Sequence, residues 1–401
     1  MTSFPELDSP TSSTTAWRML LALAVVFVLL ATTGWTAIRH RGTDMDPRAQ
    51  ALTAWREGRF DGRRLPDPHA SPQVLKRFFA SLDTRQRDRL TTRYPLVVGN
   101  LNGAPLALRY RANRLALIRA REVERRRTTS PDLTPLGREN AGRRMHRYES
   151  LLRDGRQIIA FDPAGPGRTA EVFGDLAHAR HVSIVVPGVD TNILTFQKTQ
   201  RTYTAPVGMA RSVYRAERAL EPHGANAVIA WADYTAPVGT GLDAATGRLA
   251  AEGALRLRAF VKGLPDEAAV TLLCHSYGSV VCGVAARDLD PSVTDIAVAG
   301  SPGMRAGHVS ELGTRARVWA MQDGNDWIAD IPNLELGGLG HGADPVAEGF
   351  GARRLSAAGA DGHSGYFVPN TESVANFAKL GIGAIHSVTC ADEDDCTADA
   401  S

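Results

Sequence analysis

Residues 270–286, with the sequence VTLLCHSYGSVVCGVAA, carry the strongest indication of the fold of this chain. Four apolar, β-prone residues lead into Cys274-His275-Ser276-Tyr277-Gly278, and a run of small residues typical of a helix leads out. A serine between strand and helix is the setting of the nucleophile elbow, written G-x-S-x-G. The sharp turn lifts the hydroxyl above the sheet and aims the next backbone N–H at a developing oxyanion. Cys274 replaces the first glycine of that pattern, and Gly278 keeps the second. The alternative is a buried serine in an ordinary strand-to-helix turn.

A serine nucleophile needs two partners further along the chain. A neutral imidazole must take its proton, and a carboxylate must fix the tautomer of that imidazole. The expected acid is Asp326, which follows an expected strand at 318–321 and precedes an apolar pair; Asp323 is the second candidate. The expected base is His363, in a polar loop before the last expected helix, with His341 in a glycine loop as its rival.

The oxyanion of a tetrahedral intermediate requires two N–H donors. One is expected from Tyr277, directly after the serine, and the other from Val189 in the loop PGVDTN, residues 187–192. In the same loop, Asp190 either binds substrate or caps the next helix, and the cap is the commoner role for such a residue.

Short β-rich runs alternate with helical stretches from Gln157 onward, which is typical of a mainly parallel sheet. The runs are near-continuously apolar, as expected for strands buried on both faces. The expected strands are 157–161, 171–173, 182–186, 227–231, 270–273, 296–299 and 318–321, and the expected helices are 210–220, 252–264, 279–289 and 373–380.

The part of the chain before Gln157 has a helical pattern without β-rich runs. Residues 46–72 indicate a helix followed by a linker, and residues 72–127 read as helical with breaks at 94–95 and 99–103. Two prolines in 128–137 predict a further break, and 140–153 is another expected helix. The sequence therefore predicts a helical region ahead of the sheet.

Residues 19–38 carry no charge, and about 20 such residues span the hydrocarbon layer as a helix. Trp17 and Trp35 flank the run as interface aromatics do. We expect an uncleaved transmembrane anchor over 17–39 and a protein of the cell membrane, after a disordered Ser/Thr/Pro-rich tail at 1–16. A cleaved signal peptide is the alternative. The side of the membrane on which the body lies is left open.

The amino-acid composition excludes few classes of protein function. The 401 residues carry a formal net charge of +3, which gives no case for a nucleic-acid partner. Residues 85–156 nevertheless hold 18 Arg against 7 Asp or Glu. We interpret this excess as a solvated helical face, and the alternative is a surface that attracts anionic lipid or polymer.

The four cysteines fall into two local pairs. Cys390 and Cys396 are spaced to close a small disulfide, and Cys274 and Cys282 flank the elbow, but reduced thiols fit as well. No metal-ligand spacing is present, so no metal or organic cofactor is expected.

Several segments together resemble the α/β-hydrolase superfamily and, more narrowly, a bacterial family of α/β hydrolases of unassigned function. The resemblance covers about residues 75 to 380. It is carried by LVVGNLNGAP (96–105), ANR (112–114), VVPGV (185–189), CHSYG (274–278), GSPG (300–303) and HSGY (363–366). By position, Ser276, Asp326 and His363 match the triad that this family is expected to have. The resemblance implies the fold and the reaction class but no substrate.

The expected protein is thus a membrane-anchored serine hydrolase that cleaves an ester or related acyl bond of a small-molecule or lipid-like substrate. The expected parts are a helical region at 46–155, an α/β-hydrolase domain at 156–388 and an acidic tail at 389–401. Two alternatives keep the fold: a catalytically silent binding or scaffold module at the envelope, and an acyltransferase in which an alcohol replaces water.

Overall fold

The computed structural model describes residues 46–331, 335–336, 339–391 and 396–398. The expected tail at 1–16 and anchor at 17–39 lie outside the described residues. Over the ranges that are described, no helix has the length and apolar character needed to cross a membrane. Residues from Pro47 onward form one compact unit.

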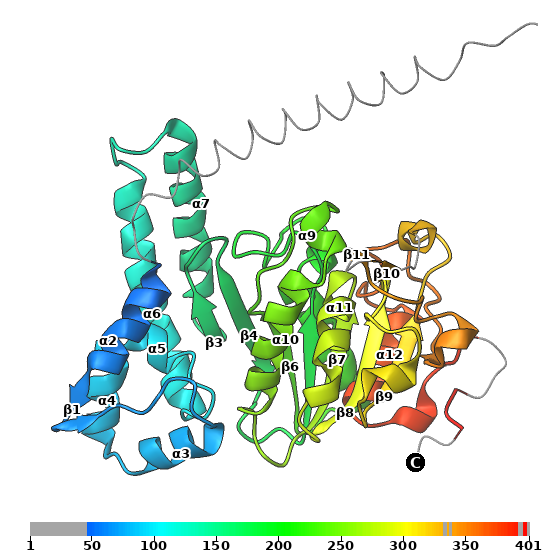
Figure 1. Ribbon diagram of the computed structural model, residues 1–401, viewed down its shortest axis with the longest axis horizontal. Helices are drawn as coiled ribbons and strands as arrows, with labels where there is room; N and C mark the ends of the chain where they lie inside the picture. Colours follow the sequence, from blue (N-terminus) through cyan, green and yellow to red (C-terminus); the bar gives the residue numbers. More distant parts are fainter. Residues whose placement is uncertain (1–45, 332–334, 337–338, 392–395, 399–401) are drawn as a thin grey trace, which may run out of the picture. The chain divides into compact units, whose positions relative to one another are not determined.

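A large, mostly parallel sheet forms the centre of this unit (Figure 1). Its strand order is β12-β9-β8-β7-β5-β6-β4-β3. All neighbours pair in parallel except that β4 runs antiparallel to both β3 and β6. The strands are β3 (Gln157–Asp162), β4 (Arg168–Gly174), β5 (His181–Val186), β6 (Asn226–Ala232), β7 (Ala269–His275), β8 (Val293–Ala299), β9 (Arg317–Met321) and β12 (Arg353–Arg354).

Helices cover both faces of the sheet and bury its apolar side chains (Figure 1). Helices α10 (Arg248–Val261) and α11 (Tyr277–Ala285) pack on one face, and α8 (Pro206–Leu220) and α12 (Glu372–Gly381) on the other. Alternate residues of β5 show the division, since Ile184 faces the first core and Val185 the second. Burying one such side chain contributes about 1.5–3 kcal/mol. The expected mostly parallel α/β sheet flanked by helices is confirmed.

The N-terminal helices lie beside β3 at one end of the sheet (Figure 1). They are α2 (Pro47–Glu57), α3 (Pro72–Ala80), α4 (Thr84–Arg93), α5 (Pro95–Val98), α6 (Leu106–Arg127) and α7 (Pro135–Leu151). Their own core includes Trp55, Phe79 and Leu90. Helix α7 begins five residues before the expected start at Asn140, because Thr134 caps it and Pro135 fits its first turn.

Two details of this region differ from the expectation. The expected linker after α2 contains a short hairpin of β1 (Arg59–Phe60) and β2 (Arg63–Arg64). A further break separates α3 from α4, where the side chain of Asp83 accepts from the Gln86 N–H in a capping box.

Shorter elements form the loops above the carboxyl ends of the strands and around the sheet. They are α9 (Leu242–Ala245), β10 (Glu335–Leu336), β11 (Leu339–Gly340) and the 3-10 turns η1 (Thr202–Thr204), η2 (Ala286–Asp288), η3 (Val309–Leu312), η4 (Trp327–Asp330), η5 (Glu348–Phe350) and η6 (Ile385–Ser387).

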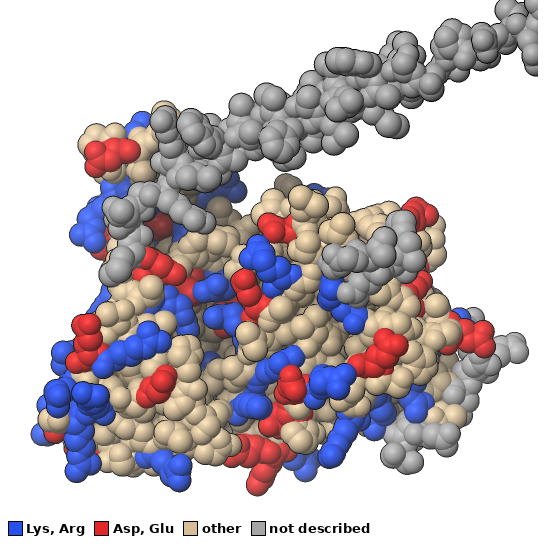
Figure 2. Space-filling model, viewed as in Figure 1, with Lys and Arg blue, Asp and Glu red and all other residues tan. Residues whose placement is uncertain are grey.

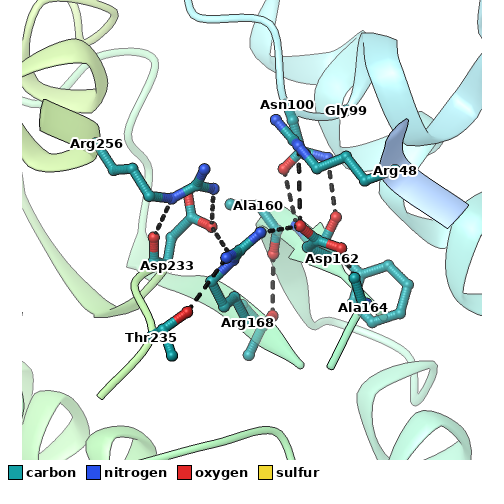
Figure 3. Close-up of polar contacts among 12 residues, drawn as sticks. Arg48, Gly99, Asn100, Ala160, Asp162, Ala164, Arg168, Asp233, Thr235 and Arg256 are labelled. Atoms are coloured by element: carbon teal, nitrogen blue, oxygen red, sulfur yellow. Dashed lines mark hydrogen bonds and ion pairs between the residues drawn. The ribbon is translucent and has the colours of Figure 1, made fainter. Parts of the chain in front are cut away.

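An alternating chain of charges joins the N-terminal helices to the edge of the sheet (Figure 3). Asp162 at the end of β3 lies between Arg48 of α2 and Arg168 of β4. Asp233, after β6, pairs with Arg256 of α10 at 2.5 Å and lies 4.0 Å from Arg168. Each aspartate therefore sits between two guanidinium groups.

The arginine-rich helices α6 and α7 carry many ion pairs. Arg111 pairs with Asp88, Arg125 with Glu122, and Arg144 with Glu124. On the face shown in Figure 2, basic and acidic side chains are interspersed. Two acids outside residues 85–156, Glu171 and Asp61, pair with Arg156 and Arg89 and so offset part of the local excess of arginine.

Candidate active site

The elbow lies where β7 ends at His275 and α11 begins at Tyr277. Ser276 between them has φ 54° and ψ −130°, a conformation that non-glycine residues rarely adopt. Its N–H donates to the Ala299 carbonyl at 3.1 Å, and its own carbonyl accepts from the Ser279 N–H at 2.9 Å. Helix α11 also approaches the end of the neighbouring strand β5 so closely that a Cβ on Gly278 would lie 2.2 Å from the Val186 carbonyl oxygen. A glycine is therefore required there.

Three side chains from distant parts of the chain form a continuous line of hydrogen bonds. The Oγ of Ser276 lies 2.8 Å from Nε2 of His363. The Nδ1 of the same ring lies 2.9 Å from Oδ1 and 3.0 Å from Oδ2 of Asp326. With Nδ1–H donating to the carboxylate, Nε2 carries a free lone pair that accepts from the serine hydroxyl. The structure brings the three expected residues together in the order serine, imidazole, carboxylate.

The carboxylate of Asp326 is held by several donors in the loop after β9. Burial by itself would raise the pKa of Asp326, but hydrogen bonds outweigh it. They come from His363, from the Tyr366 hydroxyl at 2.7 Å and from the Ile328 N–H at 2.9 Å, and together they hold the pKa below its ordinary value. Asp326 thus stays ionised and faces the imidazole.

The two second candidates lie elsewhere. Asp323 accepts hydrogen bonds from the N–H groups of Gly362 and Asn325, as expected of a turn carboxylate. His341 has its Nε2 2.6 Å from the Ala244 carbonyl oxygen, and its ring packs edge-on against Tyr277. The structure brings neither of them into the hydrogen-bonded line.

The expected oxyanion donors flank the serine. Among the described residues, no hydrogen bond engages the N–H of Tyr277 or of Val189, and both residues line a pocket with Ser276. Gly188 lies so close that an added Cβ would be 2.6 Å from the Ser276 Cβ and 3.2 Å from the Tyr277 nitrogen. The loop after β5 therefore reaches the serine through a residue without a side chain.

Asp190 does not have the expected role of a helix cap, since the next helical turn, η1, follows Arg201. Its backbone has φ 58°, its N–H donates to the Pro237 carbonyl, and its Oδ1 accepts from the Gly239 N–H at 2.8 Å. The carboxylate ties the loop after β5 to the loop after β6. The hydroxyl of Tyr234 adds a second tie by donating to the Pro187 carbonyl at 2.6 Å.

Two residues outside the expected triad, Tyr366 and His275, support the hydrogen-bonded line. Tyr366 donates to Oδ2 of Asp326 and accepts from the Asp323 N–H at 2.9 Å. Nε2 of His275 lies 2.7 Å from the carbonyl oxygen of His363, so this nitrogen carries the hydrogen and donates. Burial, followed by the neighbouring His363, lowers the pKa of His275 to about 3.

Both disulfides that the sequence left open are formed. Cys390–Cys396 closes a small loop near the end of the chain. Cys274–Cys282 joins the end of β7 to α11, and Ser276 lies between its two half-cystines. Since the chain has four cysteines, all of them are paired.

A pocket of about 150 Å³ opens beside Ser276. Its described lining contains no Asp, Glu, Lys or Arg. The apolar lining residues come from several loops and are Val189, Ala244, Ala245, Pro302, Trp327, Ile328 and Ile331. The Trp327 ring also packs against His363, with centroids 4.9 Å apart. In the described part of the chain, no group of three or more His, Cys, Asp or Glu side chains is arranged to hold a metal ion.

Comparisons with known proteins agree with this architecture. A family model described as alpha/beta hydrolase matches residues 162–336, a range that contains Ser276 and Asp326 and ends before His363. An uncharacterized protein of Mycobacterium tuberculosis strain H37Rv is 27% identical over 80% of this chain. The match spans only 57% of that relative's length.

Two further similarities concern shorter or weaker matches. An uncharacterized protein of Mycobacterium bovis is 32% identical over 48% of this chain and 74% of its own. The crystal structure of 2,6-dihydroxy-pseudo-oxynicotine hydrolase matches 63% of this chain and 81% of its own at 10% identity. Its TM-score is 0.27, too low to carry an argument. On the family model and the M. bovis relative, the chain belongs to the α/β-hydrolase family.

Proposed function

We propose that this protein is a serine hydrolase that cleaves an ester or related acyl bond. Ser276 is the nucleophile, His363 the general base and acid, and Asp326 the residue that orients His363. The observation that carries the proposal is the unbroken line of hydrogen bonds from the Ser276 hydroxyl through the His363 ring to the Asp326 carboxylate.

With this hydrogen-bonded line, the reaction has two steps, formation of an acyl-enzyme and its hydrolysis. Oγ of Ser276 attacks the acyl carbonyl carbon while Nε2 of His363 takes the hydroxyl proton. The resulting imidazolium, stabilised by Asp326, gives that proton to the leaving oxygen as the carbon–oxygen bond breaks, and an acyl-enzyme remains. Water then attacks the acyl carbon with His363 as base, and the proton returns to Oγ as the acid product leaves.

The tetrahedral intermediate carries a negative oxygen that needs donors. The N–H groups of Tyr277 and Val189 are the proposed pair, and both are without another partner among the described residues. Removing one such donor from an oxyanion hole typically raises the barrier by about 3–4 kcal/mol.

The pocket beside the serine supports a short, uncharged acyl group. Its volume is about 150 Å³ and its described lining carries no charged side chain. A dry apolar cavity of that size holds a molecule on the order of benzene. We therefore propose an acyl chain of roughly two to six carbons, with the alcohol portion of the substrate outside the pocket.

The kinetic test uses p-nitrophenyl esters from acetate to palmitate. We expect hydrolysis that is fastest for the short acyl chains and is lost in Ser276→Ala. Enlarging the pocket by Ile328→Ala is expected to move the optimum toward longer chains. An optimum at long chains would refute the proposed substrate, and turnover that survives Ser276→Ala would refute the proposed nucleophile. Added alcohols that yield new esters would identify acyl transfer instead.

We also propose that the N-terminal segment anchors the protein in the cell membrane with its body on the oxidising side. Support comes from the pairing of all four cysteines, since disulfides persist in oxidising compartments. The test places a thiol on the surface of the body by Leu220→Cys, a residue that is 49% exposed. A membrane-impermeant maleimide should label it in intact cells. Labelling only after lysis would contradict the proposed orientation.

A further inference from the structure

We infer that the Cys274–Cys282 disulfide is a positioning element for Ser276. The cross-link holds the strand and the helix of the elbow together, so that the serine hydroxyl stays within reach of His363. The inference rests on the proposed function of Ser276 as nucleophile.

The bridge encloses the serine at close range. Cys274 is the next-to-last residue of β7 and Cys282 lies in α11, with eight residues of separation and 6.6 Å between their Cα atoms. Both side chains are fully buried in the core between sheet and helices. The disulfide therefore links the two elements that the turn at Ser276 connects.

Ser276 needs such a constraint because of its backbone. Its φ of 54° is unfavourable for a residue with a Cβ. Relaxation of the turn toward negative φ would swing the side chain and lengthen the 2.8 Å contact with Nε2 of His363. Two backbone hydrogen bonds oppose that movement, from the Ser276 N–H to the Ala299 carbonyl at 3.1 Å and from the Ser279 N–H to the Ser276 carbonyl at 2.9 Å, but neither joins β7 to α11. The bond from the Ser279 hydroxyl to the Cys274 carbonyl does join them, and it is 3.4 Å long. A covalent link between the flanking elements resists it directly.

The sulfurs themselves do no chemistry in this proposal. Each is bonded to the other and buried, so neither is available as a thiolate nucleophile. The expected effect is therefore on the placement of Ser276 and not on substrate binding.

The second disulfide provides a matched control. Cys390–Cys396 closes a loop of similar size near the chain end, where the Cys396 carbonyl accepts from Arg353 of β12. Cys390 also forms a β-bridge with Leu355, and among the described residues no hydrogen bond joins either cysteine to the elbow. Replacing each pair by alanine removes one small disulfide loop in both cases, but only one of those loops contains Ser276.

The experiment compares wild type, Cys274→Ala/Cys282→Ala and Cys390→Ala/Cys396→Ala, each well below its own Tm. It measures kcat and KM for a short-chain ester and the rate of labelling by a fluorophosphonate. Because a misplacement of about 1 Å costs on the order of 100-fold, we expect kcat and the labelling rate of the elbow variant to fall at least about tenfold. KM should stay within about twofold of wild type. The control variant should match wild type in all three values.

A measurement on the wild-type chain covers the case in which the elbow variant does not fold. Tris(2-carboxyethyl)phosphine reduces each disulfide to two thiols, and the phosphine takes up the oxygen of one water molecule. Mass spectrometry after alkylation reports which pair is open. Activity should fall in step with opening of Cys274–Cys282, stay constant on opening of Cys390–Cys396, and return on reoxidation.

The results separate the inference from the proposed function. If wild type is labelled at Ser276 and a folded elbow variant keeps wild-type kcat and labelling rate, the positioning role is wrong and the hydrolase proposal stands. If activity persists while Cys274–Cys282 is open, the inference is also wrong. If wild type is not labelled at all, the proposed function itself fails.

Discussion

The ring of His275 donates a hydrogen bond of 2.7 Å from Nε2 to the carbonyl oxygen of His363. The residue before the proposed nucleophile thus holds the backbone of the proposed base. Burial lowers the pKa of the His275 ring to about 3, so the ring is neutral in the folded protein at ordinary pH.

Replacing His275 should therefore lower the rate of the reaction but should not change how that rate depends on pH. His275→Leu leaves the partly buried His363 carbonyl without this donor, and a buried group left unpaired in this way costs up to about 1–3 kcal/mol. We expect kcat to fall roughly tenfold or more, while His275→Gln, whose amide can reach the same carbonyl, keeps more of it. Both variants should keep the pH profile of kcat/KM above pH 5, since a ring with a pKa of about 3 does not titrate there. Equal kcat in the Leu variant and wild type would contradict this role.

Tyr366 should affect activity through its hydrogen bond to the carboxylate of Asp326. Its hydroxyl donates to Oδ2 of the carboxylate at 2.7 Å and helps to hold the pKa of Asp326 low. Tyr366→Phe removes that donor and leaves a more basic carboxylate facing His363. We expect kcat/KM to fall about tenfold and its acidic limb to move to higher pH. Tyr214→Phe, on helix α8, is the control. An unchanged pH profile with full activity would show that the hydroxyl is dispensable.

Glu217 should make stability depend on pH. This buried carboxyl on α8 accepts from the Ser183 hydroxyl at 2.6 Å, and burial raises its pKa from 4.5 to about 8. The folded state keeps the proton up to about pH 8, whereas the unfolded chain loses it near pH 4.5. The stability from this group is full below pH 4.5 and falls as pH rises toward 8, by up to about 1.4 kcal/mol per unit.

Glu217→Gln removes that titration and keeps an acceptor for Ser183. In urea unfolding between pH 5 and 8, the variant should gain free energy of unfolding relative to wild type as pH rises. The control is Glu252→Gln, which makes the same change at an exposed carboxylate. A difference between Glu217→Gln and wild type that is independent of pH would rule out the raised pKa.

The charge cluster between α2 and the sheet should be sensitive to loss of one partner. Asp162 is fully buried and lies between Arg48 and Arg168 (Figure 3). Asp162→Ala leaves both guanidinium groups without that carboxylate, and breaking a buried pair in this way costs about 3–5 kcal/mol in free energy of unfolding. Lys76→Ala breaks the exposed pair with Asp266 and should cost less than about 1 kcal/mol. Chemical denaturation of both variants checks this, and similar costs for the two would contradict it.

Much of the sheet could be predicted because buried parallel strands are apolar on both faces. The runs at 182–186 and 270–273 each lie inside an observed strand. Strand β12 could not be predicted in this way. It consists of Arg353 and Arg354 and pairs with β9 through its backbone, so no apolar pattern marks it.

The three residues of the hydrogen-bonded line could be predicted from the sequence for a related reason. Ser276, Asp326 and His363 lie in loops that follow strands or precede the last helix, and the carboxyl ends of parallel strands share one edge of the sheet. Their contacts with His275 and Tyr366 depend on side-chain packing over 40 to 88 residues of separation, which no local pattern encodes. Likewise, the spacing of Cys274 and Cys282 did not show that the turn at Ser276 brings a strand and a helix within disulfide distance.

The site at which a fluorophosphonate reacts shows whether Ser276 is an activated nucleophile. We expect one phosphonyl group on the wild-type protein, located by peptide mapping on Ser276, and none on Ser276→Ala. His363→Ala should be labelled far more slowly, because the serine loses its base. Equal labelling of wild type and Ser276→Ala, or no labelling of a folded wild-type protein, would contradict the claim that Ser276 is an activated nucleophile.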